Sequence, residues 1–287
     1  MINIASTTDS DFADNLLTFY VSILEHNLDE AFHFYIIDDK LSQADKSYLS
    51  QLKDIYGNCK EITFLEGNFD YYKEANTDSP DSAIKENTYY RLELPELVDC
   101  DRILYLDSDM ICTGNLDELW NEDLDGNVIG AVEDQGYVDR LDEMGVPHDK
   151  NIYFNGGLIL FDTKKWREEN VTKKVRQYIV EHPDNLIYQD QDALNAVLVG
   201  KWKVLDPRYN VQSKLARHDL ENPDPEAEKL AVKARRHPLL IHFSGWSKPW
   251  VHIGKWVHPW RDEFYRYKFI STQRLREYAE TLQEENS

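Results

Sequence analysis

The stretch that decides the fold is Ile103-Leu104-Tyr105-Leu106-Asp107-Ser108-Asp109. Its apolar residues form a continuous run, as in strands that are buried on both faces of a parallel sheet. The run stops at two carboxylates that are separated by one residue. Residues i and i+2 of a strand point to the same face, and ligands of open α/β sheets bind at the carboxyl ends of such strands. The pattern predicts a buried strand with two converging carboxylates at the edge of a sheet.

Apolar strands and amphipathic helices alternate on both sides of this stretch. Strands are expected at residues 2–6, 33–37, 61–65, 127–132, 153–161 and 239–243. Helices are expected at residues 12–26, 42–55, 88–97, 164–182 and 190–199. Ser42 fits the N-cap of the second helix, with Asp45 three residues later. The alternation predicts parallel βαβ units and thus an α/β fold.

Three segments show no clear period. Residues 67–87 are polar and are expected to form a long loop, and the charged residues 213–236 are expected to form a surface excursion. Residues 255–269 are rich in aromatic and basic side chains. A docked C-terminal helix is the favoured interpretation, with an acceptor platform or a membrane-surface patch as alternatives. We expect one domain over residues 1–250 and a helical aromatic and basic extension over residues 251–287.

The bulk composition bounds the kind of protein. The 287 residues suffice for one large α/β domain, and no run approaches the roughly 18 apolar residues that a bilayer span needs. The N-terminus lacks a basic region followed by an apolar stretch, so a signal peptide is not expected. The spacing of the three cysteines indicates neither a metal site nor a disulfide framework. These features predict a cytoplasmic protein.

The net charge of −21 at pH 7 argues against nucleic acid as a partner, because binding to phosphate backbones requires a basic face. A small anionic ligand can still bind where a metal cation and a nearby Lys or Arg reverse the local field. Most of the acidic residues are expected to serve solubility.

Asp-x-Asp pairs are frequent in this acidic chain, so their context must select among them. They are Asp9/Asp11, Asp99/Asp101, Asp107/Asp109, Asp123/Asp125 and Asp190/Asp192. Only Asp107/Asp109 directly follows an apolar strand, which favours this pair as metal ligands. An acidic turn after the strand is the alternative interpretation.

A second apolar run ends at His242, within Leu240-Ile241-His242-Phe243-Ser244-Gly245-Trp246-Ser247-Lys248-Pro249-Trp250. Gly245 allows the backbone to approach a bulky anion, and Lys248 supplies a positive charge suited to phosphate. Two carboxylates and an imidazole suit Mn²⁺ better than Mg²⁺, although Mg²⁺ is an alternative. The two stretches together predict a metal–diphosphate site, and so an enzyme that uses nucleotide sugars. A structural His242 is the alternative interpretation.

These residues resemble the retaining glycosyltransferases of family 8, from residue 2 to about residue 250. The matching motifs are Asp107 and Asp109, Tyr153-Phe154-Asn155-Gly156-Gly157, Asp190-Gln191-Asp192, and His242, Gly245, Lys248 and Pro249. Four motifs in the family's order are far more specific than any one of them. The resemblance implies a GT-A fold: a single Rossmann-like nucleotide-binding domain with a mixed, mostly parallel sheet and an adjoining acceptor region.

The resemblance also implies roles for individual residues. The implied metal ligands are Asp107, Asp109 and His242, and the implied UDP contacts are Ala5, Thr7, Asp9, Ser108, Gly245 and Lys248. The implied donor-sugar contacts are Arg91, Asp134, Asn155, Asp190 and Gln191. The residues expected to act in catalysis are Gln191, Asp190 and Lys248. A tight turn at residues 155–157 and a helix N-cap at Asp190 are the structural alternatives.

Retention of configuration can arise by front-side attack or by double displacement. In the family, the amide that matches Gln191 lies near the face opposite the leaving group, and an amide is a poor nucleophile. Front-side attack is therefore favoured, with the metal and Lys248 stabilising the departing UDP. Asp190 and Asp192 are the alternative nucleophiles.

The resemblance implies transfer of a hexose, most simply glucose or galactose, from a UDP-sugar to a glycan on a protein or a lipid. Peripheral contact with the inner membrane face is compatible with this role. The alternatives are transfer of N-acetylglucosamine and a catalytically silent nucleotide-sugar or glycan binder. A haloacid-dehalogenase-type phosphatase and a two-domain GT-B transferase fit the motifs and the length less well.

Overall fold

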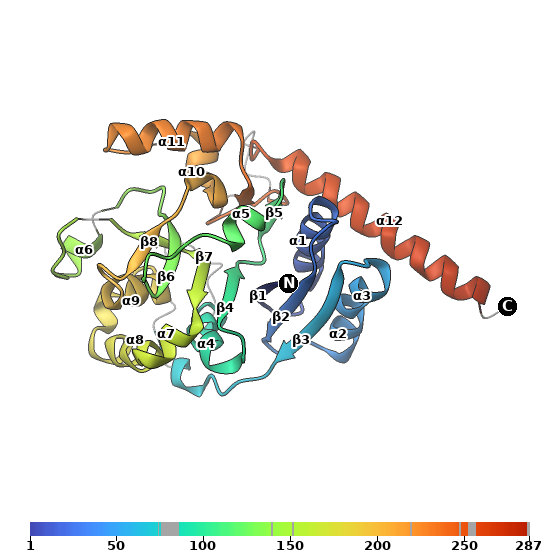
Figure 1. Ribbon diagram of the computed structural model, residues 1–287, viewed down its shortest axis with the longest axis horizontal. Helices are drawn as coiled ribbons and strands as arrows, with labels where there is room; N and C mark the ends of the chain where they lie inside the picture. Colours follow the sequence, from blue (N-terminus) through green and yellow to red (C-terminus); the bar gives the residue numbers. More distant parts are fainter. Residues whose placement is uncertain are drawn as a thin grey trace.

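A seven-stranded mixed sheet forms the centre of the protein (Figure 1). The computed structural model describes residues 1–73, 75, 86–138, 140–150, 152–218, 220–246, 248–251 and 257–285. The strands lie in the order β3 (Cys59–Leu65), β2 (Phe32–Asp38), β1 (Ile2–Thr8), β4 (Arg102–Leu106), β7 (Phe154–Asp162), β6 (Ile129–Glu133) and β8 (Trp202–Val204). All neighbouring strands run parallel except β7, which runs antiparallel to both β4 and β6. The predicted α/β class with a mixed, mostly parallel sheet is confirmed.

Helices cover both faces of this sheet. They are α1 (Ala13–His26), α2 (Gln43–Ser50), α3 (Leu52–Ile55), α4 (Leu94–Leu97), α5 (Asp117–Trp120), α6 (Arg140–Glu143), α7 (Thr163–Glu168), α8 (Val171–Glu181), α9 (Gln189–Val197), α10 (Ser213–Arg217), α11 (Pro225–Arg236) and α12 (Arg261–Glu285). The 3-10 helices are η1 (Asp70–Tyr72), η2 (Glu86–Glu93), η3 (Pro183–Asn185) and η4 (Pro207–Tyr209).

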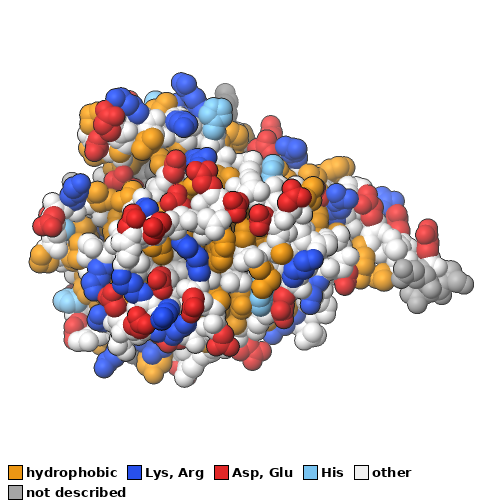
Figure 2. Space-filling view, in the orientation of Figure 1, with side chains coloured by type: hydrophobic (Ala, Val, Ile, Leu, Met, Phe, Trp, Pro, Cys, Tyr) orange, Lys and Arg blue, Asp and Glu red, His pale blue; other side chains and the backbone are white. Residues whose placement is uncertain are grey.

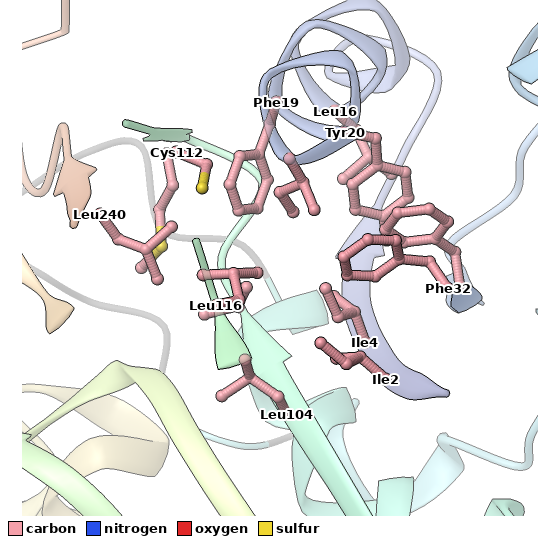
Figure 3. Packing of buried hydrophobic residues seen from close by; sticks show 14 of the residues in the cluster. Ile2, Ile4, Leu16, Phe19, Tyr20, Phe32, Leu104, Cys112, Leu116 and Leu240 are labelled. Carbon is pink, nitrogen blue, oxygen red and sulfur yellow. The ribbon is translucent and has the colours of Figure 1, made fainter. Parts of the chain in front are cut away.

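Side chains of the central strands alternate between two apolar cores. Ile4 of β1 and Leu104 of β4 pack in the cluster that includes Phe19 of α1 (Figure 3). Ala5 and Ile103, the neighbouring residues, belong to the cluster on the opposite face, which includes residues of α7, α8 and α9. Because both faces are buried, these strands contain continuous apolar runs, as the sequence predicted.

A second, three-stranded sheet holds the late apolar run. Its order is β5 (Met110–Cys112), β10 (Leu240–His242) and β9 (Val211–Gln212). The predicted strand at residues 239–243 therefore exists as β10, but it lies outside the central sheet. β10 pairs antiparallel with β5, and this register places His242 opposite Met110. The late apolar run thus ends directly beside the Asp107/Asp109 turn.

Two predicted helices have a different form in the structure. The helix expected at residues 164–182 is interrupted, because Asn170 adopts a left-handed conformation with φ of 52° between α7 and α8. Asn tolerates this conformation better than most residues. The helix expected at residues 88–97 is mostly the 3-10 helix η2, followed by the single turn of α4.

The segment at residues 213–236, expected as a surface excursion, is helical: most of α11 lies at the surface, whereas Ser213 and Leu215 of α10 are buried. This segment contains α10 and α11, and Pro225 occupies the first turn of α11. Proline is favoured at that position because its missing N–H has no partner in a helix anyway. Asp224 caps the helix by accepting a hydrogen bond from the N–H of Glu226 at 2.9 Å. The proline was thus a start signal for a helix, not a sign of irregular chain.

Other local predictions are confirmed or lie outside the described residues. Ser42 and Asp45 form a reciprocal capping box at the start of α2. Most of the loop predicted at residues 67–87 lies outside the described residues. The predicted C-terminal helix exists as α12, whereas Lys255 and Trp256 lie outside the described residues.

Helix α12 packs across α1, and its distal end extends away from the body of the protein (Figure 1). Near its start, Phe264 and Tyr267 are buried in a cluster with Phe243, which follows β10. No helix in the described part of the chain is both long and apolar enough to cross a membrane. The division of the chain at residue 250 stays a prediction.

Acidic and basic side chains are intermixed over the face seen in Figure 2. Ion pairs join charged side chains of the protein, for example Lys203 to Asp125 at 2.9 Å and Lys201 to Glu169 at 2.6 Å. Exposed pairs of this kind contribute only about 0–1 kcal/mol each. The surface charge therefore bears on solubility more than on the choice of fold.

His258 is a buried titratable group between β10 and α12. Its ring packs edge to face on Phe243, with 4.7 Å between the ring centroids. Burial, followed by the positive charges of Arg217 and Lys248, lowers the pKa of His258 from 6.5 to about 4. The folded protein therefore keeps a neutral imidazole over a pH range in which the unfolded chain takes up a proton.

We predict that the protein loses stability as the pH falls from 6.5 toward about 4, because protons then bind to His258 in the unfolded chain first. The full effect is as much as about 3 kcal/mol. Urea unfolding across this pH range should show a weaker pH dependence for His258→Gln than for the wild type. His237→Gln, which changes an exposed histidine, should keep the wild-type dependence. Identical pH profiles for the wild type and His258→Gln would contradict this account.

Candidate active site

A cavity of about 400 Å³ opens at the carboxyl ends of β1 and β4. β1 lies between β2 and β4, so the cavity sits where the strand order reverses, as expected for ligands of open α/β sheets. The predicted site residues in its wall are Thr7, Asp9, Arg91, Asp107, Ser108, Asp109, Asp134, Asn155, Asp190, Gln191, His242, Gly245 and Lys248. Ala5 is fully buried in β1 and does not line the cavity.

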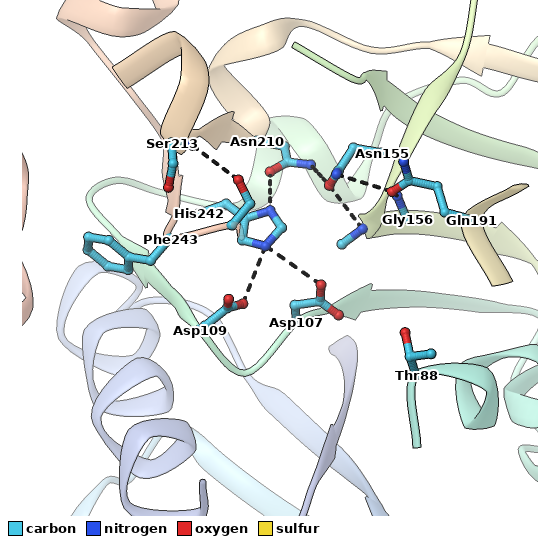
Figure 4. A network of polar contacts seen from close by, with 12 residues as sticks. Thr88, Asp107, Asp109, Asn155, Gly156, Gln191, Asn210, Ser213, His242 and Phe243 are labelled. Carbon is cyan, nitrogen blue, oxygen red and sulfur yellow. Dashed lines mark hydrogen bonds and ion pairs between the residues drawn. The ribbon is translucent and has the colours of Figure 1, made fainter. Parts of the chain in front are cut away.

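Asp107, Asp109 and His242 form a compact set of potential metal ligands (Figure 4). The Nε2 atom of His242 lies 3.3 Å from Asp109 Oδ1 and 3.6 Å from Asp107 Oδ2. One ligand atom from each residue lies within 4.8 Å of the others. Two carboxylates and one imidazole are a donor set that suits Mn²⁺ and related divalent cations. The residues present therefore fit a divalent metal site.

Asn210 orients the imidazole of His242. The Nδ1 atom of His242 lies 2.9 Å from the side-chain oxygen of Asn210, which can only accept a hydrogen bond. The proton of a neutral imidazole is therefore on Nδ1, and the lone pair of Nε2 points toward the two carboxylates. Such partners of metal-binding histidines fix the tautomer and the ring orientation. No local sequence signal marked Asn210, because its role depends on a contact between distant segments.

The metal-ligand set depends on close approach of the β7 backbone. A Cβ atom at Gly157 would lie 2.8 Å from Asp107 Oδ2 and 2.9 Å from His242 Nδ1. Both separations are shorter than van der Waals contact, so any side chain at this position would displace a ligand. The N–H of Asp107 also donates to the carbonyl of Gly157 at 2.9 Å. Gly157 is therefore required by packing.

Lys248 is held against the metal-ligand set. Its amine donates to Asp109 and to the carbonyl of Phe243, the latter at 2.8 Å. Burial would raise the pKa of Asp109, but Lys248 and His242 outweigh it and hold that pKa below its usual value. Asp109 therefore stays ionised at neutral pH.

Nearby Gly245 has φ of 68°, a left-handed conformation that favours glycine.

Arg91 ties the metal-ligand set to Asp190. Its guanidinium donates to Asp107 Oδ1 at 2.9 Å and to the carbonyl of Gly156 at 2.7 Å, and it lies 2.7 Å from Asp190 Oδ2. Thr88 donates to Asp190 at 2.8 Å. Burial raises the pKa of Asp190, and the charge of Arg91 opposes this shift. Arg91 thus pairs with two carboxylates of the cavity wall and offsets part of their charge.

Three polar side chains face each other across the inner part of the cavity. Gln191 Nε2 donates to Asp134 Oδ2 at 3.1 Å, and Asn155 Nδ2 lies 3.2 Å from that oxygen. The side-chain oxygen of Gln191 accepts a hydrogen bond from the N–H of Gly156 at 2.8 Å. Asn155 also accepts from Asn210, which connects this group to His242 (Figure 4).

Asp192 does not line the cavity. It is fully buried, and both of its oxygens accept hydrogen bonds from Arg140, at 3.1 and 3.0 Å. Tyr153 and the N–H of Tyr188 also donate to it. These contacts make Asp192 a structural ion-pair partner, directed away from the cavity.

Sequence reasoning missed part of the cavity wall. The additional lining residues are Thr8, Phe12, Asn87, Thr88, Tyr105, Tyr188, Gln189, Gln212, Ser213, Lys214, Arg217, Ser244 and Trp246. Most of them neighbour a predicted motif in sequence, and adjacency to the motif could have suggested them. Ser213, Lys214 and Arg217 lie on α10, in a segment that was expected at the surface, so no local pattern pointed to them.

A family model described as Glycosyl transferase family 8 matches residues 3–254. The chain belongs to glycosyl transferase family 8. This finding confirms the predicted family and shows that the protein is a glycosyltransferase. It also excludes the phosphatase alternative that the Asp-x-Asp pair had left open.

Comparisons with individual proteins agree with the family. The chain is 35% identical to general stress protein A of Bacillus subtilis (strain 168), over 93% of each protein. It is 27% identical to the lipopolysaccharide 1,2-glucosyltransferase of Escherichia coli (strain K12), covering 91% of this chain and 80% of that protein. The crystal structure of galactosyltransferase LgtC in complex with donor and acceptor sugar analogues superposes with a TM-score of 0.80 at 25% identity. That match covers 93% of this chain and 95% of LgtC, and the GT-A fold is confirmed.

We predict that Asn210→Ala weakens Mn²⁺ binding by roughly 10- to 100-fold, because His242 loses the partner that fixes its tautomer. Isothermal titration with Mn²⁺ measures the effect directly. Asn121→Ala is a matched control, since Asn121 is exposed and, among the described residues, its side chain bonds only to Asp117. Wild-type Mn²⁺ affinity in Asn210→Ala would show that the contact does not orient a ligand.

We predict that Gly157→Ala destabilises the protein by about 1–3 kcal/mol, as expected when a methyl group is forced into a packed site. Mn²⁺ binding should weaken as well, because the methyl group would push His242 or Asp107 aside. Gly57→Ala is the control: a Cβ at Gly57 meets nothing within 4 Å. Urea unfolding and Mn²⁺ titration of both variants test the prediction, and equal behaviour of the two would refute it.

Proposed function

We propose that the protein transfers a hexose, glucose or galactose, from a UDP-sugar to a hydroxyl group of a glycan, with retention of configuration and Mn²⁺ as cofactor. The observation that carries this proposal is the convergence of Asp107, Asp109, His242 and Lys248 in one cavity wall. Relatives named lipopolysaccharide 1,2-glucosyltransferase (Escherichia coli) and lipopolysaccharide 1,3-galactosyltransferase (Salmonella typhimurium) support the hexose and the glycan acceptor.

The uridine end of the donor is assigned to the carboxyl end of β1. Thr7 and Asp9 line the cavity there, and Ser108 lies between the two metal-binding carboxylates in sequence. Ala5 is left out of this assignment, because the whole residue is buried in the sheet and does not line the cavity. Gly245 and Lys248 are assigned to the diphosphate, since a left-handed glycine and a lysine suit close approach to an anion.

Mn²⁺ is proposed over Mg²⁺ because one of the three ligands is a nitrogen. When bound, the cation would act as a Lewis acid that stabilises negative charge on the leaving diphosphate. Lys248 lies on the same side of the cavity and adds a fixed positive charge. The chain's own contribution to departure of UDP is thus electrostatic.

The sugar ring is assigned to the wall formed by Asp134, Asn155, Asp190 and Gln191. These side chains offer carboxylate and amide groups suited to sugar hydroxyls, and hydrogen bonds among them fix their orientations. Arg91 is predicted to contact the donor, and its bonds to Asp107 and Asp190 hold it beside both the metal ligands and this wall.

Front-side attack is the proposed route to retention. A double displacement needs a free carboxylate beside the anomeric carbon. Asp192 points away from the cavity, and Asp190 is engaged by Arg91 and Thr88. Gln191 lines the cavity with an amide, which can stabilise positive charge but is a poor nucleophile. The acceptor proton passes to a phosphate oxygen as UDP leaves, so no separate protein base is needed.

We also propose a cytoplasmic site of action with peripheral contact with the inner membrane face. Helix α12 supports this part of the proposal: Phe269 and Tyr265 are exposed beside the exposed, basic Arg266. Exposed aromatic and basic side chains on one helix favour binding at an anionic lipid surface.

The test is hydrolysis of UDP-glucose, UDP-galactose and UDP-N-acetylglucosamine with Mn²⁺, with Mg²⁺ and with EDTA. We expect Mn²⁺-dependent release of UDP from UDP-glucose or UDP-galactose. NMR of the transferred product gives its anomeric configuration. UDP binding without turnover of any donor would instead indicate a silent binder, and an inverted product would exclude front-side attack.

Two variants separate the proposed roles. Asp109→Ala should reduce turnover by about 100-fold or more, because it removes a metal ligand and the partner of Lys248. Gln191→Ala should reduce it by about tenfold, corresponding to about 1.4 kcal/mol in the transition state. Asp123→Ala removes an exposed member of another Asp-x-Asp pair and should leave turnover unchanged. Equal, mild effects of the first two changes would count against the assignment.

A further inference from the structure

Helix α10 supplies three polar side chains to the cavity that the donor assignments leave unused: Ser213, Lys214 and Arg217. The helix directly follows β9, which pairs with β10 through Gln212 and His242. Its position relative to the metal ligands is therefore fixed by a backbone ladder. A wall built in this way can contribute to recognition of a substrate.

Ser213 offers a buried hydroxyl to the cavity. Its side chain is 1% exposed, and its Oγ has no hydrogen-bond partner among the described residues. The backbone N–H of Ser213 donates to Ser244 at 3.2 Å, so the residue is held in place. A buried hydroxyl without a partner costs about 1–3 kcal/mol. A ligand atom that bonds to this hydroxyl would recover that cost.

Lys214 places a positive charge beside the sugar end of the cavity. Its amine packs against Gly136, next to Asp134 Oδ1. Within the described residues this amine makes no ion pair or hydrogen bond. Lys248, by contrast, is paired with Asp109 at the diphosphate end. Lys214 therefore lies at the end of the cavity assigned to the sugar, whereas Lys248 lies at the end assigned to the diphosphate.

Arg217 and Trp246 extend the same wall. The guanidinium of Arg217 lies over the indole ring, 5.2 Å from its centroid. The Trp246 side chain is 49% exposed and lines the cavity, so it offers an aromatic face to a bound molecule. Aromatic faces beside a few convergent polar groups are typical of sites that bind small molecules. The two side chains combine a stacking surface with positive charge.

The geometry points to an acceptor subsite on this wall for a saccharide that carries an anionic group, a phosphate or a carboxylate. In this assignment Lys214 and Arg217 attract the anion, Ser213 bonds to it and Trp246 packs against the sugar ring. The chain as a whole repels anions, because its net charge is −21. The cations Lys214 and Arg217 reverse this field locally and so favour an anionic ligand at this wall. The inference rests on the proposed function, because it names the acceptor class of the same enzyme.

Binding of three probes tests the subsite: glucose, glucose 6-phosphate and glucuronate, each titrated by NMR into the protein with UDP and Mn²⁺. We expect at least one anionic probe to bind about tenfold more tightly than glucose. This factor corresponds to about 1.4 kcal/mol of binding free energy from charge–charge attraction. Tighter binding of glucose 6-phosphate identifies a phosphate, and tighter binding of glucuronate identifies a carboxylate.

Variants assign the preference to α10. Lys214→Met should remove most of it, and Lys214→Arg, which keeps the charge, should retain it. Ser213→Ala should weaken binding of the anionic probe by several-fold. Lys229→Met is the control, since Lys229 is an exposed lysine on the neighbouring helix α11.

Equal binding of the three probes, no binding of any probe, or an unchanged preference in Lys214→Met would overturn the inference. Wild-type hydrolysis of the UDP-sugar, measured on the same preparation, separates this failure from failure of the proposed function. If hydrolysis persists without a preference for anions, only the acceptor subsite is refuted. If no UDP-sugar is hydrolysed, the proposed function itself is refuted.

Discussion

The antiparallel pairing of β10 with β5 is the contact on which the active site depends. β5 begins directly after Asp109, and the pairing places His242 opposite Met110. The N–H of Phe243 then donates to the carbonyl of Asp109 at 3.0 Å. Candidate ligands from two distant segments of the sequence are thereby positioned by backbone hydrogen bonds, which vary little with the identity of the side chains.

The sequence allowed the central sheet and the candidate metal ligands to be predicted, because their signals are local. A continuous apolar run ending in carboxylates marks a buried strand end, and His242, Gly245 and Lys248 share one short stretch. The small second sheet could not be predicted, because strands of two or three residues have no measurable period. Asn210 and α10 were missed for a different reason: they gain a role in the site only through contacts between distant parts of the chain.

Within the cavity, two basic side chains pair with three carboxylates, although the whole chain is strongly acidic. Asp107 and Asp190 share Arg91, and Asp109 is paired with Lys248. A buried carboxylate without such a partner would cost several kcal/mol or take up a proton. Each pair therefore holds a carboxylate in place where a sugar nucleotide is proposed to bind.

The hydrogen bonds from His242 to Asp134 have a single direction. The carboxylate of Asp134 can only accept, so Asn155 must turn its amide nitrogen toward it and its oxygen toward Asn210. Asn210 in turn presents its oxygen to the imidazole. The Nδ1 proton of His242 is thus linked through the amides of Asn210 and Asn155 to the carboxylate of Asp134. In the proposed function, a sugar hydroxyl that bonds to Asp134 therefore acts on the orientation of His242 through the same chain of hydrogen bonds.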